Sequence, residues 1–596
     1  MSSTPTVLSS DPSQALGPSL FLQVLSHLPL GSLTSCLRVS KSWAVLISSS
    51  PTTLYKPLAA QVGIEPPILD GLYTKDKATA QSSTWSNPDS TRSDSAGHEG
   101  GVNWKIVIKD YVDLQGNWKK GRARSKWICP GRNTVWRIKI DHEEGTIITT
   151  SRIDGILVSD LQTSASEPLF EYEEIGSYAH LEFVKGYAIF NSNDDRSFEI
   201  HLTPTALSKL PPERRKNLPL SNRSITHDKG YSFTLEEHYQ PSPPSSGSDE
   251  LAIPPRGHLT YYKSLTPRTD CFAFRARIDK QYTPEERLVF GTSSDEEAYI
   301  YDLQSESNSE MERFVYDQED RGRPNYIEFD DSYLFICHST SVNVYSRTTK
   351  KKLTTFPPPV TAPFDAASAI YTCYDPSRST KKVKPNQEGE VLVGEVNVQG
   401  KWIDDNGFDG VMMASGQGRI AGREFAAVHY TSKDLFAITK SGTIYALRNY
   451  KDILAIPNPE ARDRAVNANL LAIVIRESLR QLSTYGEHVV ITSATSVFLL
   501  HTSSLPPGPY NTGSSDLLRP TIKLLNLMNV HHKGMGQCSC LQMDREKIYA
   551  VYWALGESEA GGTVNYEGER ILPPQEAIGD FGLCVKVWDF GLDLSS

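Results

Sequence analysis

The stretch IITTSRIDGILVSDL, residues 147–161, consists of a run of β-branched and aliphatic residues, a short polar turn and a second apolar run. β-branched side chains fit a pleated strand, and two such runs around a polar turn predict an antiparallel hairpin. A two-stranded ribbon is too small to be stable in water by itself. The hairpin is therefore expected to pack against further strands of the same chain.

The same pattern recurs along the chain. Further instances cover residues 187–202, 288–303, 333–347, 435–448, 488–502 and a split pair, 548–553 with 583–590. The shorter intervals are close to the roughly 40–45 residues of a propeller blade, and the longer ones contain Pro- and Ser-rich stretches. Stacking such hairpins around an axis buries both faces of each. The pattern predicts a mainly β fold, a seven-bladed β-propeller. A β-sandwich is the alternative, although two packed sheets do not require seven similar hairpins.

The composition excludes several classes of protein. The chain has 596 residues with 61 Lys and Arg against 71 Asp and Glu, a net charge of −10, which argues against a basic field that holds nucleic acid. Its longest apolar run, near residues 470–475, is much shorter than the roughly 20 residues of a membrane helix. The first ten residues lack the features of a secretory signal, and the eight scattered Cys are typical of a reducing compartment. We expect a soluble protein of the cytoplasm, the nucleus or both, without membrane or nucleic-acid partners.

A small helical segment precedes the β-rich body. Leu20, Val24 and Leu28 recur at every fourth position, as in an amphipathic helix, and Pro29 ends the pattern. A second apolar cluster between residues 33 and 47 predicts two further short helices. A unit of about 40 residues buries little surface. An exposed apolar face on this unit is therefore expected to need a partner.

Two stretches at the start of the chain resemble a known family. Residues 16–55, LGPSLFLQVLSHLPLGSLTSCLRVSKSWAVLISSSPTTLY, resemble an F-box, and VSKSW at residues 39–43 is the most specific part of this resemblance. Residues 104–122, WKIVIKDYVDLQGNWKKGR, are similar to the helical connector that F-box proteins of the WD-repeat type place before their propeller. Residues 585–589, VKVWD, are the only clear WD signature, so the repeats are diverged and WD-like. The resemblance implies that a strand near residues 125–129 completes the last blade and closes the ring.

Composition and resemblance together divide the chain into successive parts. We expect a disordered N-terminus at residues 1–15, an F-box at 16–58, and a linker with connector helices at 59–123 that contains a disordered insert at 78–101. The propeller is expected over residues 124–596. Loop insertions are expected near residues 204–256, 349–424 and 554–582.

The resemblance also implies a function. It implies a non-catalytic substrate-recognition subunit of an SCF-type E3 ubiquitin ligase, in which the F-box binds a Skp-type adaptor and, through it, a cullin, while the propeller binds an unknown target protein. Such a subunit works by proximity, because it holds a target lysine close to the ubiquitin thioester. The alternative is an F-box and propeller scaffold that acts outside a ubiquitin ligase, in trafficking or transcription. The side chains implied for adaptor binding are apolar and comprise Leu16, Pro18, Leu20, Val24, Leu28, Val39 and Trp43.

A substrate-binding rim is expected where the hairpin turns meet the loops that enter the next blades. Its candidate residues are Arg132, Arg152, Asp154, Asn193, Asp195, Asp295 and Lys440. The turns of this rim are more acidic than basic. The sequence therefore does not predict that an Arg cluster on the rim grips a phosphorylated segment.

The sequence predicts no catalytic residue, cofactor or metal site. The glycines of residues 416–422 resemble a dinucleotide loop only loosely, and the His and Cys residues between 531 and 540 lack the usual spacing of zinc ligands. A propeller enzyme is therefore the weakest hypothesis. Basic clusters at residues 214–216, 350–352 and 381–384 fit nuclear import, although solvated loop charge is the commoner explanation.

Overall fold

The protein is described here through a computed structural model. It describes residues 11–28, 30–61, 64, 104–128, 135–151, 155–161, 168–173, 175–176, 179–193, 196–218, 253–279, 287–305, 308, 310–356, 394–402, 424–475, 477–493, 496–506, 521–529, 538–555 and 581–591. The chain divides into two compact units, Met1–Trp118 and Lys119–Ser596. The expected disordered insert at residues 78–101 lies outside the described residues.

The first unit is helical. Prolines stand at the first position of α1 and α2, where a helix has no use for the missing N–H, and the Ser40 hydroxyl caps α4 by accepting a hydrogen bond from the Trp43 N–H. The apolar faces of the helices enclose one core, to which Trp104, Val107 and Ile108 also belong. The helices are α1 (Pro12–Ala15), α2 (Pro18–Leu25), α3 (Leu30–Cys36), α4 (Lys41–Ser49), α5 (Pro51–Gln61) and α7 (Trp104–Lys120).

Two sequence predictions for this unit have different outcomes. The helical connector expected at residues 104–122 is confirmed, because α7 occupies most of that stretch. The expected disorder of residues 1–15 is wrong for its last part, since Asp11 caps α1 with its side chain. Residues 1–10 lie outside the described part of the chain.

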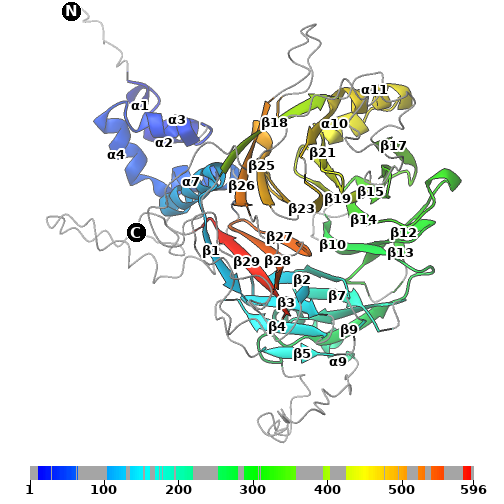
Figure 1. Cartoon of the computed structure of the whole chain (residues 1–596). Helices are drawn as coiled ribbons and strands as arrows, with labels where there is room; N and C mark the ends of the chain where they lie inside the picture. Colours follow the sequence, from blue (N-terminus) through cyan, green and yellow to red (C-terminus); the bar gives the residue numbers. More distant parts are fainter. Residues whose placement is uncertain are drawn as a thin grey trace, which may run out of the picture. The chain divides into compact units, whose positions relative to one another are not determined.

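The second unit is a ring of seven antiparallel blades, in which the chain colours of Figure 1 succeed one another around the axis. The first strand of each blade contacts the first strand of the next, and the last contacts the first, which closes the ring. A β-sandwich is thereby excluded. These inner strands are β2 (Val135–Asp141), β6 (Leu181–Val184), β10 (Ala273–Asp279), β14 (Tyr326–Phe329), β19 (Phe425–Tyr430), β23 (Leu479–Tyr485) and β27 (Cys540–Met543).

The second and third strands of every blade are the predicted hairpins. All seven are confirmed as adjacent antiparallel pairs. They are β3 (Thr146–Ser151) with β4 (Ile156–Asp160), β7 (Tyr187–Asn191) with β8 (Phe198–Leu202), β11 (Arg287–Ser293) with β12 (Glu297–Asp302), β15 (Tyr333–Cys337) with β16 (Val342–Ser346), β20 (Leu435–Thr439) with β21 (Thr443–Leu447), β24 (His488–Ser493) with β25 (Ser496–His501), and β28 (Lys547–Leu555) with β29 (Phe581–Asp589).

The outer strands complete the blades. The seventh blade receives its outer strand from the start of the unit, because β1 pairs with β29, and this confirms the closure predicted near residues 125–129. The outer strands are β5 (Phe170–Tyr172), β9 (Thr260–Leu265), β13 (Glu310–Val315), β17 (Lys352–Phe356), β22 (Leu470–Val474), β26 (Thr521–Asn529) and β1 (Arg124–Ile128).

The connections contain more regular structure than the sequence patterns predict. Within the insertion expected at 204–256, α8 (Pro204–Lys209) and α9 (Pro212–Lys216) are helical. Within the insertion expected at 349–424, β18 (Gly394–Trp402) pairs with both β22 and β26 and joins the fifth and sixth blades into one sheet. The insertion expected at 554–582 falls mostly outside the described residues. Unpredicted elements are α10 (Tyr450–Leu454), α11 (Pro459–Asn469) and the 3-10 turns η3 (Gln318–Asp320) and η6 (Thr502–Ser504).

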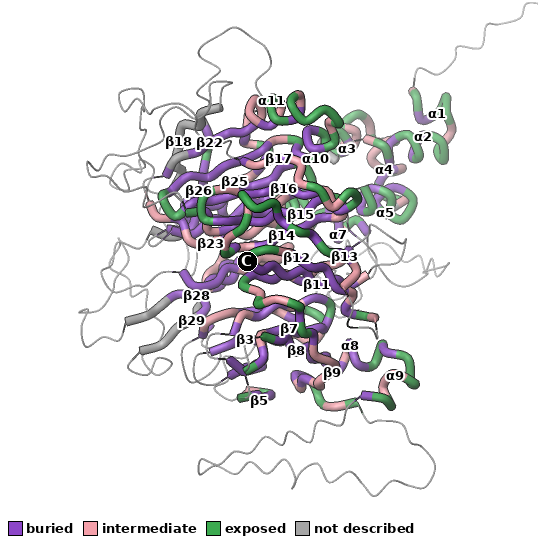
Figure 2. The backbone as a smooth tube through the Cα atoms, turned by 90° about the vertical axis from the view of Figure 1, so that its right-hand side faces the viewer, coloured by how far each residue is buried: buried purple, intermediate pink, exposed green. Residues whose placement is uncertain are grey.

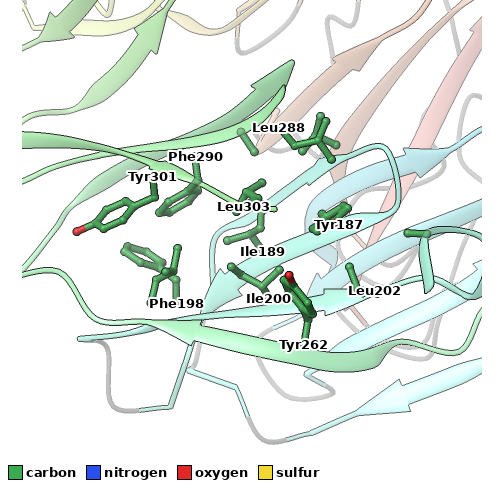
Figure 3. Packing of buried hydrophobic residues seen from close by; sticks show 14 of the residues in the cluster. Tyr187, Ile189, Phe198, Ile200, Leu202, Tyr262, Leu288, Phe290, Tyr301 and Leu303 are labelled. Atoms are coloured by element: carbon green, nitrogen blue, oxygen red, sulfur yellow. The ribbon is translucent and has the colours of Figure 1, made fainter. Parts of the chain in front are cut away.

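Apolar side chains fill the spaces between blades, and buried strands dominate this unit in Figure 2. Figure 3 shows the cluster between the second and third blades, where Phe198 and Ile200 of one blade face Phe290 and Tyr301 of the next. Burying one such side chain stabilises a fold by roughly 1.5–3 kcal/mol. Each hairpin is thus stable only between its neighbours.

Candidate adaptor-binding face and propeller axis

The N-terminal unit holds its first helix in place with a polar contact. The Trp43 indole Nε1 donates a hydrogen bond to Asp11 Oδ1 at 2.9 Å, and the Ser13 N–H donates to the same oxygen at 2.9 Å. Hydrogen bonds from Ser13 and Trp43 lower the pKa of the Asp11 carboxyl. The Trp43 ring also packs edge-on against Phe21, with centroids 4.5 Å apart. Trp43 therefore connects α1, α2 and α4.

Helix α2 has two apolar faces. Phe21, Leu22 and Leu25 are buried in the core of the unit. Leu20 and Val24 lie one turn apart on the other face and are 48% and 47% exposed. Leu16 lies just before α2, at the end of α1, and is also exposed. The structure thus leaves a stripe of apolar side chains on the surface of a small unit.

The seven side chains expected to bind an adaptor separate into two groups. Five are exposed: Leu16, Pro18, Leu20, Val24 and Val39. The other two, Leu28 and Trp43, are half-buried and pack against the core. Sequence alone does not apportion these roles, because both groups are apolar and share the same short segment.

One exposed apolar residue was missed by the sequence reasoning. Val45 of α4 is 67% exposed. The signal was present, because Trp43 and Ile47 are four residues apart and both face the core, which directs the position between them to the opposite side. Val45 is thus a further exposed apolar side chain of the F-box segment, on α4.

The central hairpin turns lie at one end of the propeller. Of the predicted rim residues, Asn193, Asp295 and Lys440 are exposed in turns of the second, third and fifth blades. Lys440 forms an ion pair with Glu424 at 2.5 Å, and Glu296, beside Asp295, forms one with Arg321 at 3.0 Å. The remaining predicted rim residues, Arg132, Arg152, Asp154 and Asp195, lie outside the described residues.

An ionic network links neighbouring inner strands around the propeller axis. The sequence patterns did not predict it. Glu182 pairs with Lys139 at 3.0 Å and with Arg275 at 3.4 Å, and Arg275 pairs with Glu328 at 3.3 Å. His429 Nδ1 lies 3.2 Å from Glu328. These five residues come from five successive inner strands, β2, β6, β10, β14 and β19. We call them the axial belt.

The electrostatics of the axial belt follow from burial and mutual charge. Burial opposes ionisation of Glu182, but the charges of Lys139 and Arg275 outweigh it and lower the pKa of Glu182. Burial raises the pKa of Glu328, although Arg275 opposes the change. Burial also lowers the pKa of His429 well below its usual range, so the imidazole is neutral at physiological pH. In the belt, the cations Lys139 and Arg275 alternate with the carboxylates Glu182 and Glu328 from one blade to the next.

Two features are missing from the described residues. None of their helices has the length and apolar character needed to cross a membrane. No group of three or more His, Cys, Asp or Glu side chains among them is arranged to hold a metal ion.

A chain with a helical module that exposes apolar side chains, followed by a seven-bladed propeller, has the architecture of an adaptor protein. Residues 14–55 match the family model of the F-box domain. The chain therefore carries an F-box domain, followed by a seven-bladed β-propeller. F-box domains in general bind Skp-type adaptors, and this architecture is typical of non-catalytic adaptor proteins.

Comparisons with whole proteins give distant likenesses. No curated protein sequence matches the chain. Among solved structures, it is similar to the computationally designed Ika8 protein, at 9% identity and a TM-score of 0.33, over 71% of this chain and 95% of the other. It is also similar to the AfRom2 CNH domain, at 9% identity and a TM-score of 0.35, over 79% of this chain and 99% of the other.

Proposed function

We propose that this protein is the substrate-recognition subunit of an SCF-type E3 ubiquitin ligase. The F-box domain binds a Skp-type adaptor and, through it, a cullin, and the propeller binds the target protein. The observation that carries the proposal is the exposure of the apolar side chains Leu20 and Val24 on one face of α2, and of Leu16 just before it, within the matched F-box domain.

The physical argument is the cost of exposed apolar surface. Adjacent apolar side chains on a small unit mark a docking surface, because isolated exposed leucines are common but stripes are not. Full burial of a Leu or Val side chain is worth about 1.5–3 kcal/mol, and covering Leu20 or Val24, each about half exposed, is worth about half of that. Val39 and Val45 are two further exposed apolar side chains of the same domain. A partner with an apolar groove for α2 fits this surface.

The proposed mechanism needs no chemistry from this chain. A closed ring of seven blades is a rigid support. Such a support keeps a bound target within reach of the ubiquitin-loaded enzyme. The rate gain comes from effective concentration. We place this activity in the cytoplasm, the nucleus or both.

The basic clusters give little support to import signals within the propeller. Lys350 pairs with Glu312, and Lys352 pairs with Asp320 at 2.6 Å. Arg214 donates to the Gln304 carbonyl at 2.7 Å. These side chains already have partners on the folded surface, and the cluster at residues 381–384 lies outside the described residues.

The test is recovery of the adaptor with the full chain. Leu20→Glu together with Val24→Glu places two charges on the exposed stripe and should abolish copurification with a Skp-type adaptor, while the melting temperature of the chain changes little. Val112→Glu is the matched control, because Val112 is 44% exposed in the same helical unit but lies on α7. Unchanged adaptor recovery by the double variant would overturn the proposed interface.

The second readout separates a ligase from a scaffold. For a ubiquitin ligase, we expect a cullin to be recovered with the wild-type chain. We also expect the protein that binds the propeller to accumulate in cells from which the chain is deleted. Recovery of the adaptor without a cullin would instead support the scaffold acting in trafficking or transcription.

A further inference from the structure

Helix α1 is a single helical turn, and its position depends on contacts outside itself. It spans four residues, Pro12–Ala15, and a helix of that length is not stable by itself in water. Leu16, its C-cap residue, donates its N–H to the Pro12 carbonyl at 3.0 Å. The Leu16 side chain is 44% exposed. The contacts that hold α1 therefore also hold the apolar side chain of Leu16.

The joint between α1 and α2 does not fix the angle between the two helices. It is Gly17, whose φ of 75° lies in the left-handed region that favours glycine, the residue with the widest range of backbone angles. Apart from its chain neighbours, no atom of the described residues lies within 4 Å of the position that a Cβ of Gly17 would occupy. Since neither the backbone nor its surroundings restrict this joint, side-chain contacts of α1 set the direction of Leu16.

Asp11 makes such a contact between segments that are far apart in the sequence. Its Oδ1 accepts hydrogen bonds from the Trp43 Nε1 and from the Ser13 N–H, each at 2.9 Å. The Ser13 hydroxyl donates to the same oxygen at 2.6 Å. Because the hydrogen bonds from Ser13 and Trp43 lower the pKa of the Asp11 carboxyl, it is ionised at neutral pH. Hydrogen bonds to an ionised acceptor are roughly twice as strong as those between neutral groups. One carboxylate thus joins the start of α1 to α4.

Trp43 is itself held in place and can serve as an anchor. Its ring packs edge-on against Phe21 of α2, which belongs to the core of the unit. Its backbone N–H donates to the Ser40 hydroxyl at 3.2 Å, at the start of α4. The anchor of α1 is therefore fixed relative to α2. Through it, the hydrogen bond between Asp11 and Trp43 fixes Leu16 relative to the exposed apolar face of α2.

We propose that the hydrogen bond between Asp11 and Trp43 positions Leu16 for contact with the adaptor, so that Asp11 and Trp43 are positioning residues of adaptor recognition. The inference rests on the proposed function, in which the F-box domain binds a Skp-type adaptor. It extends the adaptor-binding segment beyond residues 14–55, which match the F-box model, because Asp11 precedes them. Trp43 acts from its half-buried place through α1, and not by direct contact with the adaptor.

The test is a double-substitution cycle on the affinity of the full chain for a purified recombinant Skp-type adaptor, measured by isothermal titration calorimetry. Leu16→Ala should weaken binding about fivefold, because it removes the apolar contact of a half-exposed leucine. Asp11→Ala should weaken binding by at most about the same factor, since it acts through Leu16. The combined variant should bind within about twofold of Leu16→Ala alone, because two residues that act through one contact are not additive.

Conservative variants separate this role from a loss of folding. Asp11→Asn keeps a side-chain oxygen that accepts hydrogen bonds but loses the charge, so it should retain part of the affinity that Asp11→Ala loses. Trp43→Phe keeps a ring against Phe21 but has no Nε1 donor. It should weaken binding as much as Asp11→Ala, with no further loss when the two are combined. The matched control is Asp113→Ala, which removes an exposed carboxylate from α7 and should leave the affinity unchanged.

Hydrogen exchange of the free chain gives a readout that does not involve the adaptor. The N–H groups of Gln14 and Ala15 donate to the Asp11 carbonyl within α1, and that of Leu16 donates to Pro12. In Asp11→Ala these three amides should exchange at least about tenfold faster than in the wild type, because α1 opens more often. The amides of the buried residues of α2 should change little.

The outcomes distinguish the positioning role from the proposed function. Equal adaptor affinity of wild type and Asp11→Ala, additive effects of Asp11→Ala and Leu16→Ala, or unchanged exchange at residues 14–16 would each overturn the positioning role while adaptor binding by the wild type stands. Absence of adaptor binding by the wild-type chain would overturn the proposed function and the positioning role together. If Asp11→Ala does not fold, Asp11→Asn and Trp43→Phe decide.

Discussion

Ser125 of β1 lies directly opposite Trp588 of β29, so a strand from the start of the propeller completes the sheet that ends it. The register continues to Arg124 opposite Asp589 and Ile128 opposite Val585. The seventh blade therefore exists only when both ends of the unit meet. This closure makes the ring one cooperative structure and leads to the first prediction.

Trp588→Ala should destabilise the propeller strongly. Trp588 is fully buried, and removing a large aromatic side chain from a core typically costs 3–5 kcal/mol. The free energy of unfolding is measured by urea titration. Val315→Ala on the exposed face of β13 is the control and should change it by no more than about 0.5 kcal/mol. Equal effects of the two substitutions would contradict closure through β29.

The axial belt predicts a large cost for losing one carboxylate. Glu182→Gln leaves the buried Lys139 without its counter-charge and leaves the half-buried Arg275 with Glu328 alone, and breaking a buried pair such as that of Lys139 costs about 3–5 kcal/mol. Glu297→Gln removes an ion pair with Arg313 on an outer strand and should cost far less. Urea titrations of the two variants and the wild type give the comparison. A small effect at Glu182 would show that solvent screens the axis.

Buried histidines predict that the propeller loses stability in mild acid. Burial and the neighbouring His501 lower the pKa of His488 to about 3. The unfolded chain therefore binds more protons between pH 6.5 and pH 3, and stability falls as the pH falls through that window. His488 should account for a loss of about 2 kcal/mol between pH 7.5 and pH 5.

The measurement for His488 is the free energy of unfolding of the wild type and His488→Phe at both pH values. Phe keeps a ring against His501, whose centroid lies 4.8 Å away, but binds no proton. The variant should lose about 2 kcal/mol less stability than the wild type between the two pH values, because other buried histidines such as His429 still favour unfolding in acid. Parallel pH curves would show that His488 does not contribute.

Two leucines of α2 predict separable effects on stability and binding. Leu25→Ala removes a core side chain and should cost about 2–5 kcal/mol, whereas Leu20→Ala on the exposed face should cost no more than about 0.5 kcal/mol. Only Leu20→Ala is expected to weaken adaptor recovery while the fold is intact. Thermal unfolding and copurification of the same variants check both statements. Strong destabilisation by Leu20→Ala would mean that its face is part of the core.

Much of the fold is visible in the sequence because its signals are local. Six of the hairpins place two runs of β-branched, aliphatic and aromatic side chains around a polar turn within about 15 residues, and strand propensity acts on that scale. In the split seventh pair each strand has the same kind of apolar run, although residues 554–582 separate the two. Helix α11 was missed, although Asn458 before Pro459 is a typical helix start. No apolar stripe reinforced that start.

The candidate sites bring together residues that are far apart in the sequence, and no local pattern predicts such contacts. The nature of the F-box segment and the number of blades follow from short motifs and their repetition. The axial belt does not, since Lys139, Glu182, Arg275, Glu328 and His429 meet only after five blades have packed side by side. Likewise, the sequence of α2 has apolar residues on both of its faces. Only the packing of one face against the core shows which residues are structural and which are exposed. Periodicity specifies which residues share a face, but the closed ring and the packed core determine what that face meets.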